Sequence, residues 1–286
     1  MFETAILVLL YNKEIKDSNT LNSLTELKDQ YHNAKLIIWN NGPSPLNNVD
    51  CQDFKDLGYD VSIEETINNE SLAVIYNKFL VMERAKKYVL LDDDSVLNAT
   101  YILASSNCTG TDVGMPIITT LGSIQSPRID DKPYSPEIEL DDNCKIITIG
   151  SGLVIGVDIV NKLKDNYDGV FDERFYLYGV DSTFCLRLFY SKLNDKIKVI
   201  SGFSHSLSRL EKESIKQTKF RQLERSYDLG LTLRHYSSLP YAIITLLLII
   251  IGSFKRMIFR KKQIISLPPL IKAFLSGRHY RQCVGV

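Results

Sequence analysis

Three consecutive carboxylates follow an apolar stretch of the chain. Residues 88–97 read YVLLDDDSVL, so Asp92, Asp93 and Asp94 stand where a buried strand over 88–91 ends, with no basic residue adjoining them in the sequence. Along an extended chain Asp92 and Asp94 point to one side, and Asp93 points away, toward solvent or a local backbone N–H. Mg²⁺ and Mn²⁺ prefer such oxygen ligands. We predict a metal site at Asp94, with Asp92 as a second ligand or as a contact to a ribose hydroxyl. The alternative is a solvated turn whose carboxylates cap the next helix.

A second carboxylate lies behind aromatic residues, in the stretch FDERFYLYGVDSTFCLRL that contains Asp181. A carboxylate in apolar surroundings has a raised pKa and can accept a proton near neutral pH. We predict that Asp181 is a general base, while the alternative is a helix N-cap, and one residue can serve as both. Arg187 follows six residues later, and its simplest interpretation is a local salt bridge to Asp181, Glu173 or Asp172.

One histidine, His205, follows a predicted strand in the stretch GFSHSLSR. A lone histidine is more often structural than a metal ligand. As a ligand it suits Mn²⁺ or Zn²⁺ better than Mg²⁺.

The first half of the chain alternates strand and helix patterns, which predicts an α/β fold with a parallel sheet. Short apolar runs predict strands at 5–10, 35–39, 59–63 and 88–91, and helical spacing predicts helices at 17–31 and 70–86. Ligands bind beyond the carboxyl ends of such strands. The polar residues at that edge are Tyr11 and Asn12, Asn40 and Asn41, and the three aspartates.

The second half is less regular. Residues 105–145 are rich in Ser, Thr, Asp, Gly and Pro, which predicts loops and short strands, and 145–156 resembles a strand broken by glycines. A helix is predicted at 181–190, a strand at 196–200 and an exposed helix at 209–236.

The charge of the chain is unevenly distributed although its formal net charge is zero. Eight Lys or Arg and no Asp or Glu lie after position 254, while the preceding residues hold 26 basic and 34 acidic groups. An uncharged aliphatic run, 239–252, precedes this basic stretch. The aliphatic run and the basic stretch together predict a segment that lies in the interface of an anionic membrane or dips into one leaflet. A buried core helix and a single span starting near Tyr236 are the alternatives. The tail is aliphatic rather than aromatic, which argues against a nucleic-acid partner.

The five cysteines are widely spaced and form no C-x-x-C pair, which argues against a disulfide framework and favours a reducing cytoplasm. The apolar run near the start lacks a basic region and a cleavage site, so no signal peptide is expected.

Taken together, these stretches resemble the bacterial glycosyltransferases of family 2, in particular the rhamnosyltransferase-like subgroup that builds O-antigen and capsular polysaccharides. The matching segments are collinear over about residues 5–236 and read AILVLLYN, IIWNNGPS, NNESLAVIYNKF, YVLLDDDS, GSGLVIG, FDERFYLYGVDSTFCLRL, SHSLS and FRQLERSYDLGLTLRHY. The resemblance implies a GT-A fold, with a Rossmann-like mixed sheet flanked by helices. It also implies a catalytic domain over 1–236, followed by an apolar and basic membrane-associating segment over 237–286.

The resemblance also implies roles for individual residues. Asp92 and Asp94 match the D-x-D motif that holds a Mn²⁺ or Mg²⁺ ion and the donor diphosphate, His205 matches a histidine that completes the metal shell in some members, and Asp181 matches the catalytic base. The implied donor-binding residues are Tyr11, Asn12, Asn40, Asn69, Asn77, Asp92 and Asp93. The implied loop beside donor sugar and acceptor comprises Gly150, Ser151 and Gly152, together with Arg187.

Three positions depart from the family's pattern. Asn40 stands where Asp is common, Ser71 replaces a glycine of the N-x-G element, and Ser226 follows Arg225 in place of asparagine. The first changes a carboxylate contact to an amide, and the second puts close backbone approach at that element in doubt.

The function that the resemblance implies is inverting transfer of a sugar from a nucleoside-diphosphate donor to a lipid-linked glycan, at the cytoplasmic face of the bacterial inner membrane. The subgroup favours dTDP-rhamnose as donor, while UDP-hexose and UDP-galactofuranose remain alternatives. Two further hypotheses are a metal-dependent phosphate-handling enzyme that is no transferase and a family member that binds a nucleotide sugar without transferring it.

Overall fold

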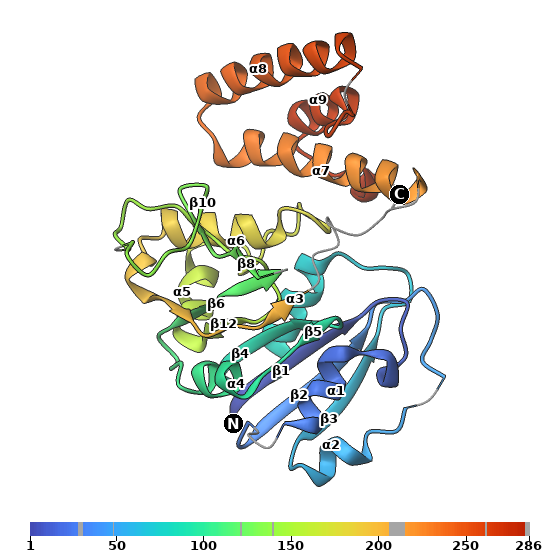
Figure 1. Ribbon diagram of the computed structural model, residues 1–286, viewed down its shortest axis with the longest axis vertical. Coiled ribbons are helices and arrows are strands. Elements are labelled where there is room, and N and C mark those ends of the chain that lie inside the picture. Colours follow the sequence, from blue (N-terminus) through green and yellow to red (C-terminus); the bar gives the residue numbers. More distant parts are fainter. Residues whose placement is uncertain are drawn as a thin grey trace.

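The computed structural model describes residues 1–27, 31–47, 49–120, 122–138, 140–205, 215–260 and 262–283. Its centre is a seven-stranded sheet with the strand order β13-β6-β12-β4-β1-β2-β3, in which only β12 runs antiparallel to its neighbours (Figure 1). The strands are β1 (Phe2–Leu10), β2 (Ala34–Asn40), β3 (Asp60–Glu65), β4 (Ala85–Asp92), β6 (Val113–Pro116), β12 (Leu153–Gly156) and β13 (Ile197–Ile200). The predicted α/β class is confirmed.

Helices cover both faces of this sheet. They are α1 (Asn19–Glu26), α2 (Gln52–Asp56), α3 (Leu72–Met82), α4 (Ala99–Ser106), α5 (Val157–Asn166) and α6 (Val180–Tyr190). Side chains alternate along a strand, so Ile6 and Val8 of β1 pack with α1, α2 and α4, whereas Leu7 and Leu9 pack with α3, α5 and α6. Burial on both faces explains why β1 and β2 are continuous apolar runs.

The carboxyl ends of β4, β1 and β2 lie side by side. Leu9 pairs with Asp92, and Leu10 pairs with Asn40, so the polar residues that follow these three strands meet at one edge. The prediction that the polar clusters share an edge is therefore confirmed.

Two small sheets complete the second half. One contains β5 (Ser95–Val96), β14 (Ser204–His205), β7 (Ile118–Thr120) and β8 (Ser123–Ser126), and the other β10 (Lys132–Pro133), β9 (Arg128–Ile129) and β11 (Ile146–Ile147). The strand predicted over 145–156 is two strands, β11 and β12, with the glycine-containing loop between them.

Three helices follow, α7 (Ile215–Tyr236), α8 (Leu239–Ile258) and α9 (Leu267–Ser276), and short 3-10 turns lie at Ile15–Asp17, Asn194–Lys196 and Tyr280–Cys283. The prediction of an exposed helix over 209–236 is wrong for its described part, because Glu224, Tyr227 and Leu231 of α7 are buried. Residues 209–214 lie outside the described residues. A Cβ at Gly230 would lie 2.4 Å from the carbonyl oxygen of Leu270, so this glycine permits the close approach of α7 and α9.

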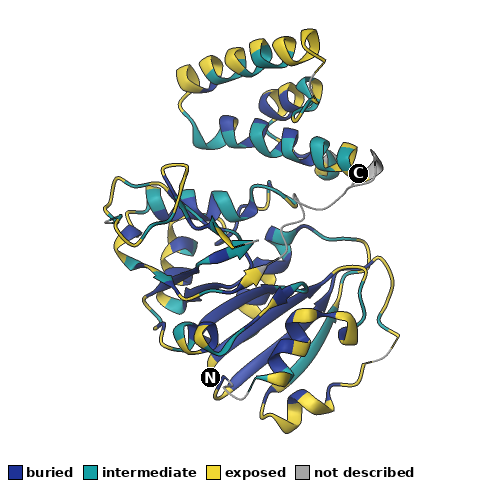
Figure 2. Ribbon diagram, viewed as in Figure 1, coloured by how far each residue is buried: buried dark blue, intermediate teal, exposed yellow. Residues whose placement is uncertain are grey.

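Helix α8 lies at the outer edge of the molecule and is mostly exposed (Figure 2). Ala242 is the residue of α8 that is buried, which contradicts the alternative of a core helix. Among the described residues, α8 is the one helix long and apolar enough to cross a membrane, judged by length and composition alone.

Candidate active site

The backbone around the three aspartates is held by neighbouring hydroxyl groups. The Thr20 hydroxyl donates to the Asp92 carbonyl, and the Ser18 hydroxyl donates to the Asp93 carbonyl at 3.0 Å. From the other side, the Asp92 N–H donates to Ser151 Oγ at 3.0 Å. The main chain is thus satisfied by α1 and by the loop before β12, and the three aspartates line a cavity.

Asp93 differs from its neighbours. Its Oδ1 lies 2.6 Å from Lys13 Nζ, and its Oδ2 accepts from the Tyr11 N–H at 3.2 Å. The prediction that Asp93 faces solvent or a local N–H is wrong, because both partners belong to the segment after β1. Folding thus brings to Asp93 the basic partner that its sequence neighbours do not provide.

A cavity of about 300 Å³ opens at this edge of the sheet. Of the predicted site residues it is lined by Tyr11, Asn69, Asp92, Asp93 and Asp94. Asn41, which the sequence placed at this edge without a binding role, lines it as well. Further lining residues that the sequence did not indicate are Leu9, Glu70, Leu72, Tyr176, Leu177, Phe220 and Arg281. No local signal marks Arg281, which is far from the others in sequence.

Asp181 lies in the first turn of α6, with its carboxylate against Gly150. Gly179, at φ +82°, occupies the N-cap, so the alternative in which Asp181 caps this helix is wrong. A Cβ at Gly150 would lie 2.7 Å from Asp181 Oδ1, so a side chain at this position would force the carboxylate to move. Burial raises the pKa of Asp181 to about 6, although the Gly150 backbone counteracts it.

Asp181 and Asp92 are close enough to affect each other's charge. Burial raises the pKa of Asp92 well above its usual value, and the neighbouring charges of Asp94 and Asp181 raise it further. The Tyr76 hydroxyl is buried near both carboxylates. Burial raises the pKa of Tyr76, and the charges of Asp92 and Asp181 raise it further. Tyr76 was missed from sequence.

The carboxylates of Asp92 and Asp94 fit a divalent cation. Mg²⁺ is usually bound through one or two carboxylates and completed by substrate phosphates. Burial is the main cause of the raised Asp92 pKa, and the repulsion from neighbouring carboxylates that adds to it is what a cation would compensate. Among the described residues no three His, Cys, Asp or Glu side chains are arranged to hold a metal. His205 pairs through its backbone with Ser95, next to Asp94, but its side chain lies outside the described residues.

Two predicted amides make structural hydrogen bonds instead of lining the cavity. Asn40 donates to Glu65 Oε1 and to the Ser44 carbonyl at 2.8 Å each, and accepts from the Gly42 N–H. Asn77 of α3 accepts from the N–H groups of the chain at 170 and 171 and donates to the carbonyl at 171. Asn12, at φ +55°, is exposed outside the cavity lining.

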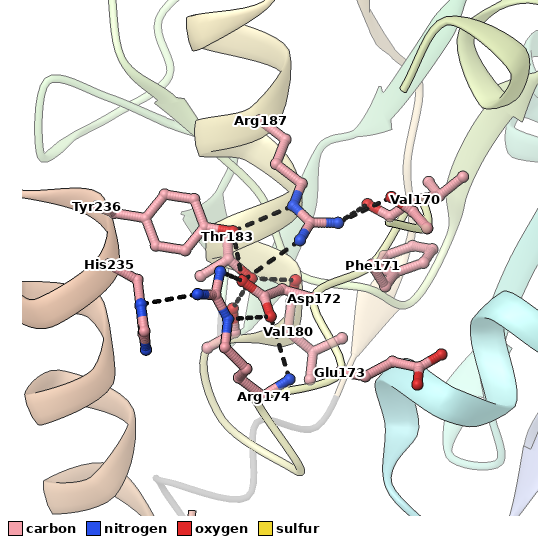
Figure 3. Close-up of polar contacts among 12 residues, drawn as sticks. Val170, Phe171, Asp172, Glu173, Arg174, Val180, Thr183, Arg187, His235 and Tyr236 are labelled. Carbon is pink, nitrogen blue, oxygen red and sulfur yellow. Dashed lines mark hydrogen bonds and ion pairs between the residues drawn. The ribbon is translucent and has the colours of Figure 1, made fainter. Parts of the chain in front are cut away.

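Arg187 is buried away from the cavity, in the network of Figure 3. Its guanidinium donates to the Gly169 carbonyl at 2.9 Å and to the Tyr236 hydroxyl at 3.1 Å, and it lies 3.3 Å from Asp172 Oδ2. The local salt bridge is thus made to Asp172, one of the three partners considered. Together with Asn77, Arg187 positions the loop that leads into Asp181.

The predicted glycine loop lies between Asp92 and Asp181. Gly152, at φ +85°, donates its N–H to the Leu90 carbonyl at 2.7 Å, and Ser151 contacts both Asp92 and Ser95. Its contact with an acceptor stays a prediction.

A further carboxylate that sequence reasoning missed, Asp228 of α7, lies close to α6. A Cβ at Gly179 would lie 2.2 Å from Asp228 Oδ1, and burial raises the pKa of Asp228 to about 7. The Asp181 charge contributes to that increase, so the two groups are neighbours.

No protein-family model matches the sequence, and no curated protein matches it. Among solved structures, the fold is similar to that of S. aureus TarS 1–349 in complex with UDP-GlcNAc, with 17% identity and a TM-score of 0.52 over 98% of this chain and 82% of that one. The same protein in complex with UDP gives 17% identity and a TM-score of 0.50, covering 90% of this chain and 72% of that one. This chain spans 40% of the longer TarS chain. These likenesses concern the fold, which is of the GT-A class as predicted.

Proposed function

We propose that the protein is a glycosyltransferase that uses a nucleoside-diphosphate sugar. The observation that carries the proposal is a cavity at the carboxyl edge of one sheet that Asp92 and Asp94 line. The buried Asp181 carboxylate does not line this cavity but lies close enough to Asp92 for its charge to raise the Asp92 pKa. The fold likeness to a protein crystallised with UDP and UDP-GlcNAc favours a UDP-sugar donor over dTDP-rhamnose. The particular sugar and the O-antigen or capsule pathway are part of the proposal.

The proposed reaction is a single displacement that inverts the anomeric centre. Asp181 accepts the proton of the attacking hydroxyl, and its pKa of about 6 leaves it ionised yet basic near pH 7. The Gly150 backbone forms a hydrogen bond with this carboxylate and so helps to hold it in place. Asp92 and Asp94 would hold a Mn²⁺ or Mg²⁺ ion, which supplies Lewis-acid stabilisation of the departing diphosphate. Tyr11, Asn41 and Asn69 line the cavity on the side of β1 and β2, where the nucleoside would bind.

We further propose that the acceptor is a lipid-linked glycan and that the protein binds the cytoplasmic face of the inner membrane. Helix α8 exposes Leu247, Leu248 and Ile251, each more than half accessible, and basic residues occupy its last turn. Apolar burial and attraction of lysine and arginine to anionic lipid reinforce each other in such a segment, at roughly 1 kcal/mol per basic residue.

A donor panel tests the proposal. The full-length protein is incubated with UDP-GlcNAc, UDP-galactose, UDP-galactofuranose and dTDP-rhamnose, each with Mn²⁺ or Mg²⁺, and both thermal stabilisation and release of nucleoside diphosphate are measured. We expect one donor to stabilise the fold and to be hydrolysed slowly, because water takes the place of the acceptor hydroxyl when no acceptor is supplied. Absence of any stabilisation or release across the panel would refute the proposal.

A further inference from the structure

The segment 279–282, called here the strap, returns from α9 to the site and is anchored on one buried carboxylate. Glu224 of α7 is 1% exposed, and it accepts from the Tyr280 hydroxyl at 2.5 Å. Arg281 Nη2 lies 3.2 Å from Glu224 Oε1, and His279 Nε2 lies 3.4 Å from Oε2. Burial alone would raise the pKa of Glu224, but these three partners hold it below its usual value. The strap is therefore a docked part of the fold.

Aromatic stacking sets the course of the strap past the cavity. His279 stacks on Tyr176 with ring centroids 4.6 Å apart and planes 15° apart. The Arg281 guanidinium lies over the rings of Tyr176 and Phe220, at 5.6 and 5.5 Å from their centroids. Tyr176, Phe220 and Arg281 all line the cavity that the three aspartates line. The strap thus completes the cavity wall on the side of α7.

Charge distinguishes Arg281 from the other described residues of this wall. Glu70, Asp92, Asp93 and Asp94 line the cavity with carboxylates, and Arg281 is the cationic side chain among the described lining residues. A diphosphate would meet net repulsion from the carboxylates alone, even with one divalent cation at Asp92 and Asp94. A guanidinium presents several donors in a plane and matches phosphate oxygens in a bidentate way.

We propose that Arg281 binds the diphosphate of the nucleotide donor, so that the strap is part of the donor site. This inference rests on the proposed function and assigns a role to a residue that lies outside the resemblance to known transferases. Tyr176 and Phe220 keep the guanidinium in the cavity wall, and Glu224 orients it through the ion pair between Arg281 Nη2 and Glu224 Oε1.

The proposal is tested by calorimetric titration of the full-length protein with UDP and with uridine in the presence of Mn²⁺. If the donor panel selects a dTDP sugar, dTDP and thymidine are used instead. For Arg281→Gln we expect affinity for the diphosphate to fall at least about tenfold, equivalent to about 1.4 kcal/mol, while affinity for the nucleoside stays unchanged. Arg281→Lys, which keeps the charge but loses the planar fork, should fall between the wild type and Arg281→Gln.

Arg278→Gln is the matched control, because Arg278 is exposed, lies three residues away and does not line the cavity. It should bind both probes as the wild type does. The inference is overturned if Arg281→Gln binds the diphosphate as tightly as the wild type does. It is also overturned if the variant loses affinity equally for diphosphate and nucleoside, because Arg281 would then act only on the shape of the wall. A wild-type protein that binds neither diphosphate would instead refute the proposed function.

Discussion

At the scale of single residues, the site contains carboxylates in three different environments. Asp93 is paired with Lys13, Asp181 is held against Gly150, and Asp92 lies between Asp94 and Asp181. Groups of one chemical type can take different roles when their surroundings move their pKa values apart. Substituting each carboxylate in turn therefore separates these roles.

Asp181→Asn should reduce turnover by at least about 100-fold and leave donor affinity unchanged, because general-base catalysis contributes typically about 10²- to 10⁴-fold. Turnover is measured with saturating donor, and donor affinity by calorimetry. Near-wild-type turnover in this variant would contradict the role.

The pH dependence of the wild type offers a second test of Asp181. A base must be deprotonated to act, so turnover should rise as the pH increases through about 6, the value to which burial raises the Asp181 pKa. A bound cation nearby lowers that value and moves the rise to lower pH. A profile that falls over the same range would exclude Asp181 as the base.

Asp94→Ala should weaken UDP binding in the presence of Mn²⁺ at least about tenfold and should bind UDP in EDTA as the wild type does. The reason is that the carboxylate acts on the phosphates through the cation. Calorimetry with and without EDTA measures both. Wild-type UDP affinity that is indifferent to EDTA would contradict a metal at this position.

At the scale of elements, the loop before α6 is joined to α6 and α7 through one buried carboxylate. Arg174, Arg187 and Tyr236 all contact Asp172, which is 3% exposed at its side chain (Figure 3). Burial alone would raise the pKa of Asp172, but the hydrogen bonds from Arg174 and Tyr236 outweigh it and lower the pKa to about 2. This junction determines where α6, and with it Asp181, lies relative to the sheet.

Asp172→Asn should therefore lower the free energy of unfolding by about 2 kcal/mol at pH 7. The folded-state pKa lies below the unfolded one, so the ionised form stabilises the fold above about pH 4, and this advantage disappears as the pH falls toward about 2. Denaturant unfolding at several pH values measures the difference from wild type. Asp168→Asn, at an exposed position in the same loop, should be neutral. A deficit that persists undiminished at low pH would contradict this account.

The sequence predicted the strands well and the long-range partners poorly. Continuous apolar runs identify β1, β2 and β4 because burial on both faces requires them, and the order of elements then determines which strand ends meet. The three adjacent aspartates were also recognisable from the local sequence, because they directly follow such an apolar run. Lys13 beside Asp93, and Arg281 in the cavity wall, depend on contacts between segments far apart in the chain, for which one sequence holds no local pattern. Asn77 and Arg187 were expected near the ligands, yet their side chains satisfy buried backbone groups.

At the scale of the whole molecule, α8 forms an outer apolar surface while α9 and the strap connect back to the active site. The domain boundary predicted at 236 stays a prediction, although α9 packs closely on α7 at Gly230. Removing all residues after 236 would therefore disturb the cavity wall as well as α8. Membrane binding is better tested within the full chain.

A double variant, Leu247→Glu with Ile251→Glu, should reduce binding to vesicles that contain anionic lipid at least about tenfold, because it places two charges on the exposed face of α8. Both side chains are more than half exposed, so the fold should tolerate the change. Co-sedimentation measures binding. Leu103→Glu, an exposed apolar position on α4, is the control and should bind as the wild type does. Unchanged binding of the double variant would contradict the assignment of α8.

The return of the strap to the cavity has a consequence for the order of events during synthesis. The cavity wall is assembled from positions between 9 and 281, so a ribosome-bound chain that already contains all three aspartates still lacks one side of the pocket. Contacts over such separations form slowly, because the intervening chain must first be ordered. If the proposed function holds, full affinity for the diphosphate therefore develops only late in synthesis, after the helices that precede the strap have emerged and folded back.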